Sequence, residues 1–131
     1  MIVRAVDTNI LARYALNDDP VQSPMAGTVI AQGVFIPVTV LLELSWLLSS
    51  RYRQPPEIVA SIIAEIIALP TVTIANPDEI AWALRRFGDG ADFADMIHLV
   101  ESMAADSFVT FDRAIPHDAG SSCPLPIETL G

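Results

Sequence analysis

The chain has 131 residues, the length of one compact domain, and 52% of them are hydrophobic. Its 16 acidic residues outnumber 7 basic residues, all arginine, and the net charge of −9 excludes a protein that binds nucleic acid through general basic charge. The single cysteine, Cys123, excludes an intrachain disulfide, and no apolar segment is long enough to cross a bilayer.

The N-terminal sequence predicts a cellular location, and the mean hydropathy predicts a binding partner. The first residues lack the basic, apolar and small-residue pattern of a secretory signal, so we expect a cytoplasmic protein without a membrane span. A mean hydropathy of +0.46 is high for such a protein. We therefore expect a partner or a second copy of the chain to bury part of its apolar surface.

The first half of the chain alternates between strand and helix patterns. A short buried strand over residues 2–6 is followed by one helix over residues 8–16 and another over residues 24–33. Residues 34–38 then predict a second strand, and residues 39–52 predict a long apolar helix.

The second half continues the alternation. Its clearest signal is Asn76-Pro77-Asp78-Glu79, which combines a capping residue, a proline at the first helical position and a glutamate at the capping-box position. The elements expected in order are a helix over 56–69, a strand over 71–75, a helix over 77–88, a helix over 92–105, a strand over 107–111, and an edge strand near residue 127 after a loop.

Strands that alternate with helices predict an α/β fold. We expect residues 1–131 to form one domain, with a central, mainly parallel sheet and helices on both faces. Ligands of such sheets bind beyond the carboxyl ends of the strands. Asp7 and Asp112 both follow a predicted strand, and they are therefore the first candidate site residues.

Each of the candidate acids also has a purely structural interpretation. Asp7 can simply cap the following helix, and Asp112 can be an ordinary turn residue. Asp92 and Asp95 can both be acids of a first helical turn, where they favour the helix dipole. Taken one at a time, these four residues leave both interpretations open.

Glu43 is the acid for which a structural role is hardest to find. It lies within the apolar run from Val40 to Leu48, and no basic residue lies within one helical turn of it. A carboxylate in such a setting loses solvation unless it is paired or binds a metal. We therefore expect Glu43 to belong to a site.

Several acids placed together need a compensating charge. Clustered carboxylates repel one another and raise each other's pKa values, and a divalent cation removes that penalty. Mg²⁺ and Mn²⁺ prefer oxygen ligands and can lower the pKa of a bound water while stabilising charge on a phosphoryl oxygen. A cluster of these acids thus predicts metal-dependent phosphodiester hydrolysis.

Four segments of the chain resemble the motifs of one known family. They are VDTNIL at residues 6–11, Glu43 in its apolar helix, DFADMIHLV at residues 92–100, and VTFDR at residues 109–113. In this order and spacing they resemble the four motifs of PIN-domain ribonucleases. The short length and general layout resemble the VapC-like toxins of toxin–antitoxin pairs in particular.

The resemblance implies a central parallel sheet and an acidic pocket that holds Mg²⁺ or Mn²⁺. By position, Asp7, Glu43 and Asp95 would be the core acids and Asp112 the fourth, while Asp92 competes with Asp95 for the third motif. The flanking polar residues that match are Thr8, Asn9 and Thr110. The resemblance also implies an RNA substrate, a cognate antitoxin and a homodimer.

Two other functions are compatible with acids at strand ends. A phosphotransfer domain built on an aspartate normally needs a lysine to hold the phosphoryl group, and this chain has none. A catalytically inactive PIN-fold interaction module would not need its acids, whereas all four are present here. RNA cleavage with Mn²⁺ would distinguish this module from an enzyme.

Overall fold

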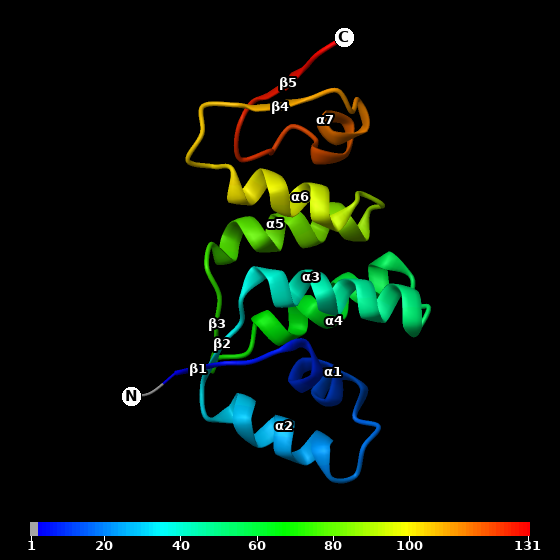
Figure 1. Cartoon of the computed structure of the whole chain (residues 1–131), viewed down its shortest axis with the longest axis vertical. Helices are drawn as coiled ribbons and strands as arrows, with labels where there is room; N and C mark the ends of the chain where they lie inside the picture. Colours follow the sequence, from blue (N-terminus) through cyan, green and yellow to red (C-terminus); the bar gives the residue numbers. More distant parts are fainter. Residues whose placement is uncertain (1–2) are drawn as a thin grey trace.

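The computed structural model describes residues 3–131 and contains both strands and helices (Figure 1). The strands are β1 (Arg4–Ala5), β2 (Val34–Phe35), β3 (Val72–Thr73), β4 (Phe108–Thr110) and β5 (Ile127–Thr129). The helices are α1 (Thr8–Leu16), α2 (Gln22–Ala31), α3 (Val38–Trp46), the π-helical η1 (Leu47–Arg51), α4 (Pro56–Ile67), α5 (Pro77–Gly88), α6 (Phe93–Glu101) and α7 (Ala114–Ala119).

The strands form two separate parallel sheets. In the first, β2 lies between β1 and β3, with Arg4 opposite Val34 and Val34 opposite Val72. In the second, β4 pairs with β5, and Phe108 lies opposite Ile127. The α/β class and the parallel pairing are confirmed, but within residues 3–131 the expected single central sheet is replaced by two small ones.

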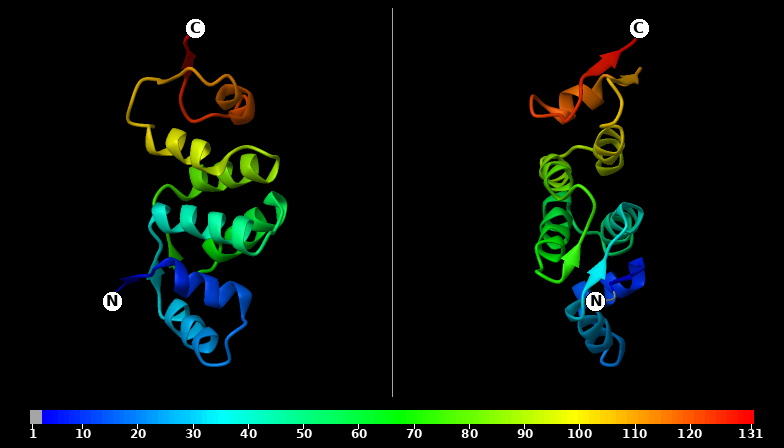
Figure 2. Two further views of the ribbon diagram at one scale, coloured as in Figure 1. Left: turned by 45° about the vertical axis from the view of Figure 1, so that its right-hand side comes forward. Right: turned by 90° about the vertical axis from the view of Figure 1, so that its left-hand side faces the viewer.

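Packed helices separate the two sheets. From one end to the other, the molecule stacks α1 and α2, then α3 and α4, then α5 and α6, and finally α7 with β4 and β5 (Figures 1 and 2). Helix α6 packs against both α5 and α3. Helices α5 and α6 lie between β4 and the first sheet (Figure 1).

The core is therefore built mainly from helices. Its fully buried side chains include Leu11 of α1, Leu44 of α3, Ile63 of α4, and Met96 and Leu99 of α6. Burying such apolar groups supplies most of the driving force for folding.

Strand β1 is exposed, which contradicts the expectation of a buried first strand. Both of its residues, Arg4 and Ala5, are exposed to solvent, and of residues 3–6, the described part of the expected strand, only Val6, directly after β1, is buried. Ile2, which the expected strand also includes, lies outside the described residues.

Local sequence signals place most helix ends within a few residues. Helix α5 begins at Pro77 and ends at Gly88 as expected, although Asn76 lies at φ 51° and its side chain makes no capping hydrogen bond. The apolar helix expected over residues 39–52 is divided between α3 and η1. Helix α6 ends at Glu101 rather than at residue 105, and α7 forms within the segment expected to be a loop.

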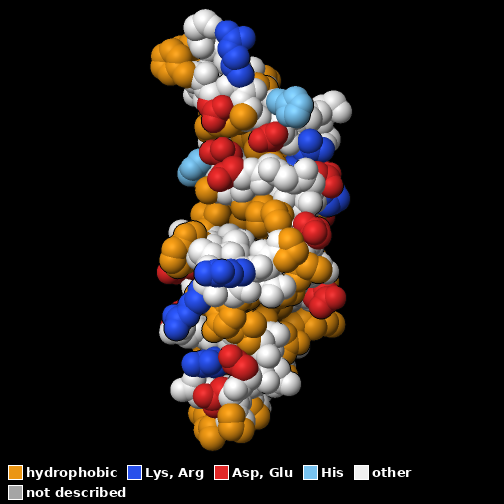
Figure 3. Space-filling view, turned by 90° about the vertical axis from the view of Figure 1, so that its right-hand side faces the viewer, with side chains coloured by type: hydrophobic (Ala, Val, Ile, Leu, Met, Phe, Trp, Pro, Cys, Tyr) orange, Lys and Arg blue, Asp and Glu red, His pale blue; other side chains and the backbone are white. Residues whose placement is uncertain are grey.

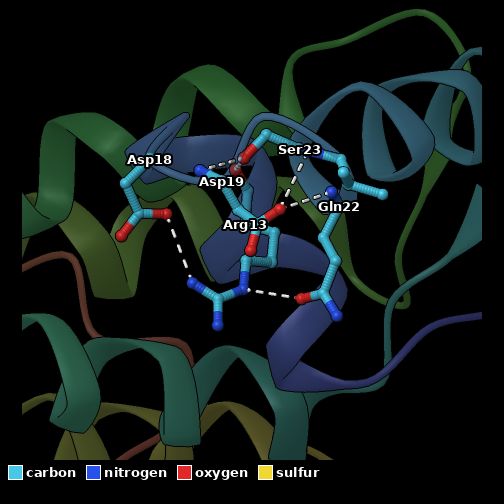
Figure 4. Close-up of polar contacts among 6 residues, drawn as sticks. Arg13, Asp18, Asp19, Gln22 and Ser23 are labelled. Atoms are coloured by element: carbon cyan, nitrogen blue, oxygen red, sulfur yellow. Dashed lines mark hydrogen bonds and ion pairs between the residues drawn. The ribbon is translucent and has the colours of Figure 1, made fainter.

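A polar cluster fastens α1 to α2 (Figure 4). Arg13 Nε donates to Gln22 Oε1 at 3.0 Å, and Arg13 also pairs with Asp18 at 3.3 Å. The Ser23 hydroxyl donates to the Arg13 carbonyl oxygen at 2.8 Å. Backbone N–H groups of Gln22 and Val21 donate to the Asp19 carboxylate and lower its pKa. These contacts have a structural role, since each of them joins the two helices or the turn between them.

No helix in residues 3–131 combines the length and the apolar character that crossing a membrane requires.

Candidate functional site

Asp7 and Glu43 form the first group of candidate acids, here called the N-terminal acid group. Asp7 follows β1 and caps α1, since its Oδ1 accepts a hydrogen bond from the Ile10 N–H at 3.2 Å. The next residue, Thr8, donates from Oγ1 to Glu43 Oε1 on α3 at 3.1 Å. This contact spans 35 positions of the sequence and joins the first two motifs.

Glu43 is exposed, so the expectation of a desolvated carboxylate is wrong. The buried side of α3 carries Leu41 and Leu44. Thr39, Glu43 and Trp46 follow at helical spacing on the opposite, exposed side. Glu43 therefore keeps its solvation, and burial by itself gives no reason for it to bind a metal.

Asp92, Asp95 and Asp112 form the second group, here called the C-terminal acid group. Asp92 caps α6 by accepting from the Asp95 N–H at 2.9 Å. Asp112 follows β4, and its Oδ1 accepts from the Ala114 N–H at 2.9 Å at the start of α7. Thr110 Oγ1 accepts from the Asp112 N–H at 2.9 Å, so this threonine helps to fix the turn. Asp7, Asp92 and Asp112 thus each have the structural role that their local sequence allows, as a helix cap or a turn residue.

Asp95 lies in surroundings that disfavour its charged form. Partial burial raises its pKa, and the nearby charges of Asp92 and Asp112 raise it further. The positive form of His98, one turn later on α6, acts in the opposite direction. A negative charge on Asp95 is therefore less favourable than on a free aspartate side chain.

The two acid groups do not meet. In the part of the chain that the structure describes, no three acidic, histidine or cysteine side chains gather closely enough to hold a metal ion. Acidic side chains gather near the α6–α7 end of one face (Figure 3). Of the N-terminal acid group, Asp7 lies just after β1 in the other sheet and Glu43 lies on α3.

Comparisons with protein-family models, curated proteins and solved structures find no match for this chain. The functional assignment therefore rests on the residues themselves and on their arrangement.

The flanking polar residues have different surroundings. Thr8 and Thr110 each contact a motif acid or its backbone, as their positions in the motifs suggested. Asn9 instead lies along a groove between α1 and α2, beside Arg13 and Met25. The link between Thr8 and Glu43 was not foreseen, because no local pattern relates residues 35 positions apart.

Asp95 predicts a pH-dependent gain in stability on neutralisation. Since its pKa is raised in the folded state, ionised Asp95 opposes folding once the pH exceeds that pKa, and this penalty is absent below the usual value of 3.8. Asp95→Asn should therefore raise the unfolding free energy at pH 7 in EDTA by less than about 1 kcal/mol.

Urea denaturation at several pH values measures this effect. The gain should disappear when the pH falls below 3.8, the unperturbed aspartate pKa. Asp106→Asn, an exposed acid in the loop before β4, is the control and should change stability little. An Asp95→Asn protein that is less stable than the parent at pH 7 would contradict the prediction.

Proposed function

We propose that this chain is a metal-dependent endoribonuclease that hydrolyses RNA phosphodiester bonds and acts as the toxin of a toxin–antitoxin pair. The observation that carries the proposal is the approach of motif residues that come from different parts of the sequence. Thr8 links the first motif to Glu43, and Asp95 lies within the electrostatic influence of Asp112. Asp7 and Asp112 each follow a strand, Glu43 lies in the helix after β2, and Asp95 lies in the helix before β4.

The donor chemistry of these acids suits a hard divalent cation. Carboxylate oxygens are the preferred ligands of Mg²⁺ and Mn²⁺, which supply a water of lowered pKa and stabilise phosphoryl charge when bound. Among residues 3–131, however, the arrangement within one chain brings fewer than three such ligands together. The acids thus fit the metal by type but not by arrangement, and the site is incomplete within one chain.

A single central sheet would complete the site. Strand β1 is paired only with β2, and β4 only with β5, in the described residues. We propose that the working form joins these two edges into one mainly parallel sheet with helices on both faces. The N-terminal and C-terminal acid groups would then lie at the carboxyl ends of neighbouring strands.

The negative net charge determines how the proposed partners, an RNA substrate and an antitoxin, would bind. RNA would have to approach a protein of net charge −9, so a bound cation and a few arginines would provide the attraction. A cognate antitoxin could inhibit the enzyme by placing a basic side chain, such as an arginine, among the carboxylates. A cytoplasmic location and a homodimer belong to the same proposal.

RNA cleavage in the presence and absence of metal tests the proposed function. The purified chain should cleave single-stranded RNA in millimolar Mn²⁺ or Mg²⁺ and stop when EDTA is added. Calcium is a useful control, because it offers the same charge with a larger radius and looser geometry. The second candidate function is a catalytically inactive PIN-fold interaction module, and the separation of the two acid groups is the observation that favours it. A chain that leaves varied RNAs intact in Mn²⁺ would support this module.

A further inference from the structure

Trp46 is a large aromatic side chain that lies in solvent at the end of α3. It is 69% exposed, whereas Trp82, the other tryptophan of the chain, is 6% exposed and donates its indole N–H to Ser122 Oγ at 3.1 Å. Folded proteins usually cover most of the area of a tryptophan, because its burial contributes strongly to stability. The exposure of Trp46 therefore needs a reason other than folding.

Trp46 lies on the same side of α3 as Glu43. The two residues are three positions apart and both are exposed, while Leu44 and Ser45 between them are buried. Side chains at this spacing on a helix are neighbours, with Cβ atoms about 5–6 Å apart. The indole thus lies beside a motif acid, close enough for one bound nucleotide to contact both.

The next turn, η1, adds positive charge to this end of α3. Arg51 closes η1 and Arg53 follows two residues later, and both are exposed. Within residues 3–131, neither side chain makes an ion pair or a hydrogen bond to the protein. Four of the other arginines do donate hydrogen bonds within the protein, namely Arg4, Arg13, Arg86 and Arg113. Arg51 and Arg53 can therefore contact a ligand without breaking a structural bond.

The backbone of this segment is held in a defined conformation. Ser50 Oγ donates to the Trp46 carbonyl oxygen at 2.6 Å, and the Gln54 N–H donates to the Leu48 carbonyl oxygen at 3.0 Å. Arg53 has φ 53°, in the left-handed region where glycine is favoured. Residues other than glycine that are held in this region are concentrated at binding and catalytic sites.

An exposed indole beside unpaired arginines suits a single-stranded nucleic acid. Every base has a face that can stack on an aromatic ring, and arginine binds phosphate through its paired N–H donors. Neighbouring base pairs cover these faces in duplex RNA, so stacking of this kind selects unpaired bases. Two local arginines can provide the attraction although the net charge of the whole chain is −9.

The surroundings of Trp46 favour nucleic acid over a protein partner. The exposed residues nearest to it along α3 and η1 are Glu43, Ser49, Ser50 and Arg51. Protein–protein interfaces are depleted in glutamate and serine, and their centres are apolar. A polar strip with one aromatic ring instead resembles the surface on which single strands bind.

We propose that Trp46, Arg51 and Arg53 form a substrate-binding subsite for single-stranded RNA, here called the α3 subsite. Trp46 stacks on an unpaired base, and Arg51 and Arg53 contact phosphates of the same strand. The α3 subsite holds the strand beside Glu43 and discriminates against duplex RNA. The inference deepens the proposed ribonuclease function and rests on it for the reaction that the bound strand undergoes.

Tryptophan fluorescence tests the stacking contact without reference to activity. The parent chain is titrated in Ca²⁺ with a single-stranded RNA oligonucleotide, which should quench its emission because a base covers Trp46. Trp46→Phe should lose this quenching, since the remaining Trp82 is buried. An abasic strand of the same length, with the phosphates but no bases, is the matched control and should leave the emission of the parent unchanged.

Trp46→Ala should weaken RNA binding by about 5- to 150-fold, the loss expected for stacking on one base. The contact exists in the bound substrate and in the transition state alike, so KM should rise by the same factor while kcat stays unchanged. Trp46→Phe should keep most of the affinity, because a phenyl ring also stacks. Val21→Ala, at a similarly exposed apolar residue before α2, is the control and should change neither constant.

Salt dependence tests the phosphate contacts. Arg51→Gln and Arg53→Gln should each reduce the slope of log affinity against log salt concentration by about 0.7, the value for one phosphate contact on a single strand. Arg85→Gln removes an exposed arginine from α5 and should leave the slope unchanged. A parental slope in both Arg51→Gln and Arg53→Gln would overturn the phosphate contacts.

The outcomes separate the α3 subsite from the proposed function. A chain that cleaves RNA in Mn²⁺ with the same KM before and after Trp46→Ala would overturn the subsite and leave the function standing. Quenching by single-stranded RNA in a chain that cleaves no RNA would support the subsite and reject the ribonuclease. A Trp46→Ala chain with a changed mass in light scattering but the parent's RNA affinity would assign Trp46 to a protein contact and overturn the subsite.

Discussion

Asp7→Asn and Glu43→Gln should each lower RNA cleavage at least about 100-fold, the usual loss when one electrostatic group is removed from a catalytic site. Each substitution removes a negative charge and keeps the shape of the side chain. In Asp7→Asn, the amide oxygen can still cap α1 by accepting from the Ile10 N–H. In Glu43→Gln, the amide oxygen can still accept from the Thr8 hydroxyl. Initial rates with Mn²⁺ and a labelled single-stranded RNA measure the loss.

The control for these variants is a glutamate that has no place in the proposed site. Glu57→Gln, at the exposed start of α4, removes the same charge and should leave the rate unchanged. Circular dichroism should show that all three variants keep the parent's helix content. Glu43→Gln protein that cleaves RNA as fast as the parent would remove Glu43 from the site.

Ile63→Ala should destabilise the fold by about 2–5 kcal/mol, the cost of removing a large buried aliphatic side chain. Ile63 lies in the middle of α4 and is 0% exposed, so truncation leaves a cavity that the surrounding helices fill only in part. Guanidinium denaturation measures the change in unfolding free energy.

Ile58→Ala is the matched control, because it makes the same change on the same helix. Ile58 is 44% exposed and should cost less than about 1 kcal/mol. Equal losses at the two positions would mean that α4 presents a different face to the core. That outcome would also question the packing of α4 against α5.

The helix ends and caps that the sequence predicts depend on interactions between residues that are close in sequence. The start of α5 at Pro77 and its end at Gly88 depend on the conformational limits of proline and on helix-end preferences within a few positions. The caps that Asp7 and Asp92 provide also join residues only three positions apart. Such interactions are local, and the alternation of these elements is enough to indicate an α/β fold.

The exposure of Glu43 could not be foreseen in the same way. The run from Val40 to Leu48 is apolar, but which face of the helix turns inward depends on the helices that pack against it. The structure turns Leu41 and Leu44 inward and leaves Glu43 and Trp46 in solvent. Composition along one helix cannot distinguish these arrangements, since most of its side chains are apolar.

The sequence by itself determined which acids follow strands or begin helices, because caps and strand ends are set by neighbours along the chain. Only the tertiary structure decided which acids come together. The contact of Thr8 with Glu43 and the packing of α3 against α6 both join segments 35 or more residues apart. Such contacts form only if their energy exceeds the entropy lost in closing long loops, and that balance depends on the packing of the whole chain.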